Sequence, residues 1–522
     1  MGRSTSKRDQ IELLTTNFSC RTLVGETILR FLLVKDLLIE EEPAREKGRP
    51  LPLGDVAAWI GSLDVSIDAR DRVKVLGSVE GKAVFYSSTG PMDEIWQGEE
   101  FRKDVDFPGA LPGMEVNSHG RISYITEGDS PLEAEGKLLY QLKIEVELFL
   151  SIIDPQQVEV AIGVKDISPE KVSRRIIAAE ELVGEDVVSV PVTEEFTFEE
   201  EPGYIKFLRG YIKDFSWEQG KEVVNLKGEL VTVSYFCAGS ERGFKEKRRQ
   251  FTAQASFSQL GKDCQVSPFP RVVYAVNEVH GKNVQQTVFI DIFLRVTRTL
   301  QQEVISDIQG VNVKKEYMLL PKQLGTVKES LELVQKLSLP YPQQVASGPY
   351  RLLNLELEPR DGTINVNGTL EKNLYYLPAE EEEFGFEEES EKEKLPLIRK
   401  MEEDFQCTLY LPGAGAESEV TAYLSVNASE FAPTENDTLQ INHALLEVKA
   451  RARQEFSVIV PYRVAPGTSI VIYAAKCGDT LLKVARSYGV KPLAIAEANG
   501  LEEDASLDIG QKLLIPLMFS SE

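Results

Sequence analysis

Histidine, cysteine, tryptophan and methionine are scarce in this sequence, whose 522 residues include 3 His, 5 Cys, 3 Trp and 6 Met. The five cysteines are widely spread, form no CxxC pair and have no histidine nearby: Cys20, Cys237, Cys264, Cys407 and Cys477. This spacing argues against a zinc site and against a disulfide framework. We therefore expect free thiols in a reducing compartment, and neither a metal nor another cofactor.

Positive charge is also in short supply, because 58 Lys and Arg stand against 83 Asp and Glu and give a formal net charge of −25. Binding to nucleic acid or to an anionic membrane is disfavoured, since phosphate groups are bound by clustered Lys and Arg. The most apolar segment, residues 31–39, is far shorter than the ~20 residues of a membrane span. The first residues, MGRSTSKRDQ, are polar and unlike a secretory signal. We expect a cytoplasmic protein that binds no nucleic acid and has no membrane span.

Catalytic motifs are absent as well, since the sequence contains no P-loop, no GxSxG and no HExxH. His119, His280 and His443 lie far apart, which favours ordinary structural roles. Three pairs of acidic residues are adjacent in sequence: Glu180-Glu181, Glu194-Glu195 and Glu402-Glu403. Neighbouring side chains point apart on a helix or a strand, so these acids are interpreted as solvated faces. We predict that the chain is not an enzyme; a hydrolase is the least favoured alternative.

A repeat of about 150 residues is visible in three copies. The segments FRKDVDFPGA, FTAQASFSQL and FQCTLYLPGA begin at Phe101, Phe251 and Phe405 and share a Phe-x-x-x-apolar-x-apolar pattern. An upstream marker in each copy centres on a glycine: Gly77, Gly228 and Gly368. A third marker, LVGE, stands at residues 23–26 and 182–185, with a weaker echo at Leu324-Gly325. The markers keep their order, which indicates tandem copies of one unit.

Alternating apolar and polar residues indicate half-buried antiparallel strands within each copy, for example over residues 140–148, 288–296 and 443–452. The marker glycines would be bulges or close backbone approaches, and the Pro-Gly that follows the Phe pattern would be a turn. We therefore predict a mainly β fold with three tandem β-sandwich-like domains. We expect a helix over residues 168–184, with Ser168 as its N-cap.

Two segments at similar places in the second and third copies differ sharply in charge. Residues 239–250 are basic, whereas residues 379–394 are strongly acidic. The favoured interpretation is two solvated loops that prevent an edge strand from pairing. The alternative is that Arg242, Lys245, Lys247, Arg248 and Arg249 meet the acidic loop of a neighbouring domain or molecule in a salt-sensitive assembly.

The last segment, KCGDTLLKVARSYGVKPLAIAEANG at residues 476–500, differs from everything before it. Residues 470–477 read as a strand, after which Asp479 would cap a first helix. Pro492 suits the first turn of a second helix that Gly500 ends, and residues 510–516 alternate as a final strand. The pattern predicts a small βααβ unit.

This unit resembles a LysM domain at the following positions: Tyr473, Gly478, Asp479, Thr480, Leu481, Ala485, Tyr488, Val490, Ile495, Asn499, Leu501, Gly510, Gln511, Leu513, Ile515 and Pro516. In that family two loops form a shallow groove for N-acetylglucosamine-containing glycans. The resemblance implies a groove with these residues: Gly478, Asp479, Thr480 and Leu481 on one side, and Asn499, Gly500 and Leu501 on the other. The alternative is that Asp479 and Asn499 are only caps and Leu481 is only core.

The chain as a whole resembles the SipL-type spore-envelope morphogenetic proteins, in which repeated SPOCS domains precede a terminal LysM domain. The resemblance implies a non-enzymatic scaffold or adaptor of spore coat assembly in the mother-cell cytoplasm, at the forespore surface. Its LysM domain would dock onto the coat morphogenetic ATPase SpoIVA and tether the coat to the forespore. The alternative is a cell-wall or cortex protein that binds peptidoglycan or N-acetylglucosamine oligomers.

This organisation places an N-terminal tail at residues 1–14 and a LysM domain at residues 467–518. The SPOCS-like β repeats would occupy residues 15–155, 156–308 and 309–462, and the third would carry the acidic loop.

Overall fold

The computed structural model describes most of the chain between residues 13 and 518. The described ranges are 13–40, 45–46, 49–87, 90–127, 132–134, 137–165, 167–311, 313–338, 342–378, 395–433, 437–460, 468–476, 479–488, 490–502 and 505–518. The acidic segment 379–394, Cys477 and Gly478 lie outside these ranges, as does most of the expected N-terminal tail.

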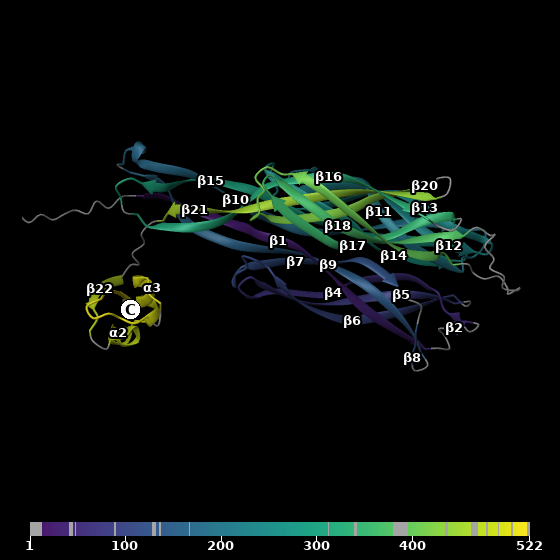
Figure 1. Cartoon of the computed structure of the whole chain (residues 1–522), viewed down its shortest axis with the longest axis horizontal. Coiled ribbons are helices and arrows are strands. Elements are labelled where there is room, and N and C mark those ends of the chain that lie inside the picture. Colours follow the sequence, from purple (N-terminus) through teal and green to yellow (C-terminus); the bar gives the residue numbers. More distant parts are fainter. Residues whose placement is uncertain are drawn as a thin grey trace, which may run out of the picture.

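The strands fall into three units of similar organisation and a small C-terminal unit (Figure 1). The first unit contains β1 (Leu13–Glu40), β2 (Arg45–Glu46), β3 (Arg49–Pro50), β4 (Leu53–Ala69), β5 (Arg72–Ser87), β6 (Gly90–Asp106), β7 (Glu115–Glu127), β8 (Leu132–Ala134) and β9 (Lys137–Val164). The second contains β10 (Val172–Thr197), β11 (Tyr204–Gln219), β12 (Val223–Ala238), β13 (Glu241–Ser256), β14 (Cys264–His280) and β15 (Asn283–Ile308). The third contains β16 (Lys315–Leu337), β17 (Pro342–Arg360), β18 (Thr363–Pro378), β19 (Leu397–Tyr410), β20 (Glu419–Pro433) and β21 (Thr438–Ile459). The C-terminal unit contains β22 (Thr468–Ala474), α2 (Leu481–Tyr488), α3 (Pro492–Asn499) and β23 (Lys512–Met518).

Strand pairing follows one pattern in the three large units. The longest strands pair as β1-β9-β7, β10-β15-β14 and β16-β21-β20, and the middle strands form a second sheet as β4-β5-β6, β11-β12-β13 and β17-β18-β19. The pairings are antiparallel, and an apolar core fills the space between the two sheets of each unit. The mainly β fold is thereby confirmed. The division into three tandem domains stays a prediction, because the units also share a core.

Two of the sequence markers meet in space in every unit. Each marker glycine lies on the central strand of the second sheet, directly opposite the first Phe of the Phe pattern: Gly77 opposite Phe101, Gly228 opposite Phe251 and Gly368 opposite Phe405. A Cβ added at these glycines would lie 2.4, 2.9 and 2.3 Å from the Cζ atom of the facing ring. The predicted close approach is therefore correct, and it places each phenyl ring over bare backbone.

The LVGE marker is a β-bulge at which each long strand changes its packing partners. The register shifts between Leu23 and Gly25 in β1, and equivalent shifts occur at Gly184 in β10 and Gly325 in β16. On the C-terminal side of the bulge, each strand contributes to its own unit. On the N-terminal side, all three contribute to a core shared with their partner strands. The marker therefore separates two packing environments along one strand.

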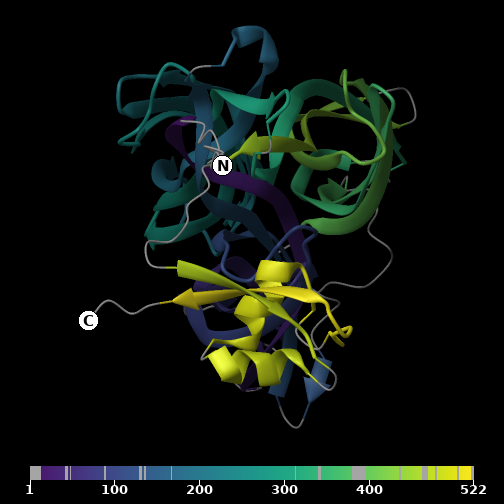
Figure 2. The ribbon, with the colours of Figure 1, turned by 90° about the vertical axis from the view of Figure 1, so that its left-hand side faces the viewer.

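A shared core joins the three units. The units lie side by side in the view along the long axis (Figure 2). The shared core contains Phe18 and Cys20 of β1, Ile177 of β10, and Met318 and Leu320 of β16, together with residues of β9, β15 and β21. Strands β1 and β9 have 28 residues each, which corresponds to about 90 Å of extended chain. Because of this length, the paired strands β1 and β9 contribute residues both to the core of the first unit and to the shared core.

The helix expected over residues 168–184 is wrong. Only Pro169–Lys171 form a short 3-10 turn, Ser168 makes no side-chain cap, and the remainder belongs to β10, which pairs with β15 along its length. Tertiary pairing thus overrides local helix propensity. The expected boundary between residues 155 and 156 also falls inside a strand, because β9 continues to Val164.

The basic segment 239–250 is not a loop, because most of it lies in β13, which pairs with β12 from Glu241 onward. β13 is an edge strand of its sheet. The ammonium group of Lys245 lies 4.2 Å from the ring centroid of Phe198, and Arg248 pairs with Glu246 at 2.7 Å. The edge position is what the favoured protective role requires, and that role stays a prediction.

Candidate functional site

The C-terminal unit packs two short helices against a two-stranded sheet, apart from the long β assembly (Figure 1). Its core contains Leu481 and Val484 of α2, Ile495 of α3, and Leu513 and Ile515 of β23. The strand–helix–helix–strand order predicted from the sequence is therefore correct. Leu481 is only 2% exposed and belongs to this core, as the alternative interpretation expects.

Asp479 organises the loop that follows β22. Its Oδ2 atom accepts hydrogen bonds from the Tyr473 hydroxyl and the Lys476 backbone N–H, both at 2.7 Å. These bonds, that of Lys476 first, lower the pKa of Asp479 below its usual range. The expected N-cap role is wrong, because helix α2 begins at Leu481 and the Lys483 N–H donates to Thr480 Oγ1 at 3.3 Å. Thr480 is the capping residue.

Asn499 and Gly500 organise the loop that follows α3. Gly500 ends the helix in the left-handed conformation with φ of 64°, as predicted. The Leu514 N–H donates to Asn499 Oδ1 at 2.7 Å, and Asn499 Nδ2 donates to the carbonyls of Leu514 and Ile495 at 2.8 and 2.7 Å. Asn499 therefore ties α3 to the edge of β23. Leu501 is partly buried against the core of the unit.

Backbone contacts bring the loop after β22 next to the segment before β23. Thr480 bridges Ser506, the Ala475 N–H donates to the Gln511 carbonyl at 2.9 Å, and the Gly510 N–H donates to the Ala475 carbonyl at 2.7 Å. In the described part of this unit, no hydrogen bond joins Asp479 or Thr480 to the group Asn499, Gly500 and Leu501. Gly478 lies outside the described residues, and the two-sided groove stays a prediction.

Two aliphatic side chains are exposed beside these loops, among exposed polar residues such as Thr480 and Asp508. Leu482 at the start of α2 is 52% exposed, and Ile509 in the turn before β23 is 75% exposed. Neither was singled out from the sequence. A signal was available, because each stands next to a matched LysM position without contributing to the helical or strand pattern of the core.

The described residues hold no group of three or more His, Cys, Asp or Glu suited to a metal ion, and none of the described helices is long and apolar enough to cross a membrane. His119, His280 and His443 lie on three different strands, β7, β14 and β21. His119 stacks on Phe293 with a centroid distance of 5.5 Å, which is a packing role.

The interpretation of the adjacent acids as solvated faces is wrong for one member of each pair. Glu180, Glu194 and Glu403 are buried, although neighbouring side chains do point apart as expected. Each buried carboxylate has a partner: Arg451 for Glu180, the Thr232 hydroxyl for Glu194, and Lys372 for Glu403.

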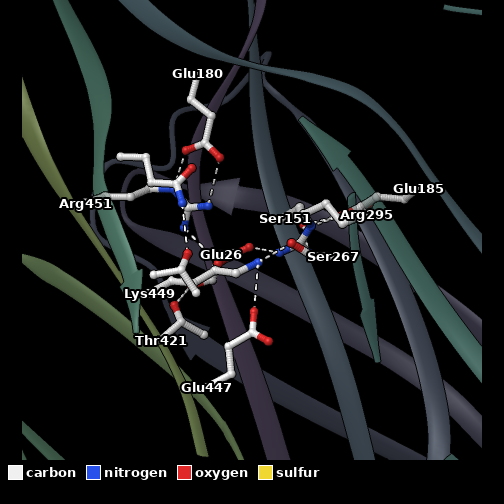
Figure 3. A network of polar contacts seen from close by, with 12 residues as sticks. Glu26, Ser151, Glu180, Glu185, Ser267, Arg295, Thr421, Glu447, Lys449 and Arg451 are labelled. Carbon is white, nitrogen blue, oxygen red and sulfur yellow. Dashed lines mark hydrogen bonds and ion pairs between the residues drawn. The ribbon is translucent and has the colours of Figure 1, made fainter. Parts of the chain in front are cut away.

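Glu26 is the centre of a buried charge network that joins the three units (Figure 3). It pairs with Arg295 of the second unit and with Arg451 of the third, whose Nη1 lies 2.8 Å from Glu26 Oε1. Arg451 also binds Glu180 at 2.7 Å. The sequence held a signal for this network, since Glu26 is the last residue of the LVGE marker.

The polar groups of this network bind one another and adjoin a small cavity. Burial, followed by the nearby charge of Arg295, lowers the pKa of Lys449 to about 7. Lys449 is nevertheless held by the Ser267 hydroxyl at 2.8 Å and lies 3.7 Å from Glu447. The adjoining cavity has a volume of about 20 Å³, which is room for about one water molecule and not for a substrate.

Comparison with known protein families gave one match, the LysM domain, over residues 473–516. Neither the curated proteins nor the solved structures gave a match. The matched range covers both helices, the last two residues of β22 and β23 as far as Pro516. Residues 473–516 of this chain are a LysM domain, a family that indicates binding of peptidoglycan or a related carbohydrate.

Proposed function

We propose that this chain is a non-enzymatic adaptor of the SipL type in spore coat assembly. The three large units are tandem SPOCS domains that form an elongated body, and the LysM domain docks onto the coat morphogenetic ATPase SpoIVA. The protein acts in the mother-cell cytoplasm and tethers the coat to the forespore surface.

The observation that carries this proposal is how the polar side chains of the LysM loops are hydrogen-bonded. One carboxylate oxygen of Asp479 and both polar atoms of the Asn499 side chain already make hydrogen bonds within the domain. Exposed Leu482 and Ile509 remain beside the loops. Protein interfaces draw their binding energy from apolar anchors that become buried, whereas a glycan needs free polar groups and aromatic faces. The surface therefore fits a protein partner better.

The state of the cysteines supports the proposed compartment. Cys20, Cys264 and Cys407 are free thiols in the described part of the chain. Burial raises the pKa of Cys20 to about 11, so this thiol is unreactive at neutral pH. Free and protected thiols agree with a reducing environment.

Peptidoglycan binding is the second candidate function, and the LysM match itself favours it. In this alternative, Asp479, Thr480, Asn499, Gly500 and Leu501 hold an N-acetylglucosamine oligomer through backbone groups. The long β body then displays the domain at a wall or cortex.

Charge substitutions at the exposed aliphatic residues test the docking surface. Leu482→Asp and Ile509→Asp are expected to weaken SpoIVA binding to the full chain at least about tenfold, because each would bury a carboxylate in an apolar interface. Tyr410→Asp is the matched control, since Tyr410 is 72% exposed in the third unit, and it should bind as the unaltered protein does. Unchanged SpoIVA affinity in both LysM variants would show that this surface is not the docking site.

A further inference from the structure

A cavity of about 320 Å³ lies where the three large units meet, away from the LysM domain. Its wall is formed by β11 and β14 of the second unit, by β17 and β20 of the third, and by residues of β1, β7 and β9 of the first. This volume falls in the range of small-molecule sites, which often form between domains. Aromatic and aliphatic side chains, including Phe215, Trp217 and Leu352, form much of the lining.

Arg209 brings an uncompensated positive charge to this cavity. It lies on β11, lines the cavity and is only 5% exposed. Its guanidinium donates one hydrogen bond to the Tyr350 hydroxyl at 3.1 Å, and its Cζ atom lies 4.7 and 5.4 Å from the ring centroids of Tyr211 and Tyr350. Among the described residues, the Nε–H has no hydrogen-bond partner. No carboxylate within the described ranges lies at ion-pair distance from Arg209.

The other buried arginines are different. Arg121, Arg295 and Arg451 each bind at least one buried carboxylate at 2.8 Å or less. A buried charge without a partner is costly, so an arginine kept in this state beside a cavity indicates a counter-charge that the described part of the chain does not supply.

A second observation shows an excess of positive charge at the same cavity. The carboxylate of Glu147 is shared by three guanidinium groups, those of Arg121 at 2.6 Å, Arg30 at 2.7 Å and Arg271 at 3.6 Å. Arg30 and Arg271 both line the cavity. One carboxylate therefore faces three guanidinium groups, although the chain as a whole is acidic, with a formal net charge of −25.

The acids that line the cavity do not neutralise this excess. Glu145 is already bound by Arg351 at 2.8 Å, and Glu447 is bound by Lys328 at 2.9 Å. The third acid, Asp214, is an exposed residue with φ of 49°.

We propose that this cavity binds a small organic anion whose carboxylate or phosphate group pairs with Arg209 and whose apolar part lies against the aromatic wall. Guanidinium forms strong, paired hydrogen bonds with both head groups. The flanking rings of Tyr211 and Tyr350 restrict the guanidinium before the ligand arrives, which reduces the entropy lost on binding. The bound anion would make contacts with all three units at once. This inference does not depend on the function proposed for the LysM domain.

Benzoate and phenyl phosphate are suitable probes, because they share one ring and differ in the head group, and benzamide is the neutral control. Calorimetric titration of the full chain at fixed ionic strength should show binding of at least one anion with a Kd below about 10 mM, and weaker binding of benzamide. Binding of benzoate alone would identify a carboxylate ligand, and binding of phenyl phosphate alone a phosphate ligand. Absence of binding by both anions, or equal binding of benzamide, would overturn the proposal.

Variants of Arg209 decide whether this side chain is the binding group. Arg209→Met should weaken anion binding at least about tenfold, and it should unfold at the same or a higher temperature because an unpaired buried charge is removed. Arg209→Lys retains the positive charge without the paired donors of the guanidinium, so its affinity for the anion should fall less than that of Arg209→Met. Arg174→Met, at a residue that is 46% exposed and does not line the cavity, should bind as the unaltered chain does. Unchanged anion affinity in either Arg209 variant would contradict the proposal.

Discussion

His119 makes the stability of the β body sensitive to acid, and the effect can be worked out from its surroundings. The ring lies among the aromatic side chains of the junction, with its centroid 5.5 Å from that of Phe293 and 6.4 Å from that of Phe149. Its Nε2 atom has no hydrogen-bond partner in the part of the chain that the structure describes. Burial first, and then the charge of Arg121, lowers its pKa to about 4 from the ordinary value of 6.5. Asp291 and Glu147 act in the opposite direction but do not cancel this effect.

The sign follows from the depressed pKa of the folded state. Between pH 6.5 and pH 4 the unfolded chain binds a proton that the folded chain does not, so stability is lost as the pH falls through this window. The pKa difference corresponds to about 3 kcal/mol in total, of which about 2.5 kcal/mol is lost by pH 4.5. The loss is a large part of the stability of a typical domain.

His119→Phe removes the titrating group and keeps an aromatic ring. Phe269 occupies the equivalent place in the second unit, opposite Phe293. Urea unfolding at pH 7 and pH 4.5 should show that the variant loses about 2.5 kcal/mol less than the unaltered protein. His280→Gln is the control, because His280 is exposed at the end of β14. An equal loss in His119→Phe and the unaltered protein would refute the reasoning.

Two further substitutions test close packing and loop closure. Gly368→Ala should lower the free energy of unfolding by about 1–3 kcal/mol, because the new Cβ would lie 2.3 Å from the Phe405 ring. Gly415→Ala is the control in the same thermal-denaturation measurement, because a Cβ added there would have no atom within 4 Å; its free energy of unfolding should change by less than about 0.5 kcal/mol. Asn499→Ala should remove hydrogen-exchange protection from the Leu514 amide, because that amide donates to the Asn499 side chain. Protection that survives the change would mean that the loop is closed by other contacts.

The repeat was readable from the sequence because its markers encode local geometry. A phenyl ring can lie against the backbone of the facing strand only where that strand has a glycine. Gly77 opposite Phe101 and Gly368 opposite Phe405 both meet this condition. The LysM elements were readable for a similar reason, since Gly500 and Pro492 act within their own helix. Such features depend on few neighbours.

Other features depend on contacts between distant parts of the chain and were not readable. Residues 172–184 form part of β10 because they pair with β15 and pack into the shared core, although their local pattern favours a helix. Arg451 binds Glu180 across 271 positions of sequence, so the burial of Glu180 follows from how the units pack. Asp479 does not cap the helix, because the Tyr473 hydroxyl and the Lys476 N–H both donate to its Oδ2 atom.

Calorimetric titration of the full chain against purified SpoIVA and, separately, against N-acetylglucosamine oligomers and muropeptides tests the adaptor proposal most directly. The account predicts saturable binding of SpoIVA and no binding of the glycans at millimolar concentration. Glycan binding without SpoIVA binding would contradict the adaptor proposal and establish the LysM domain as a carbohydrate-binding module.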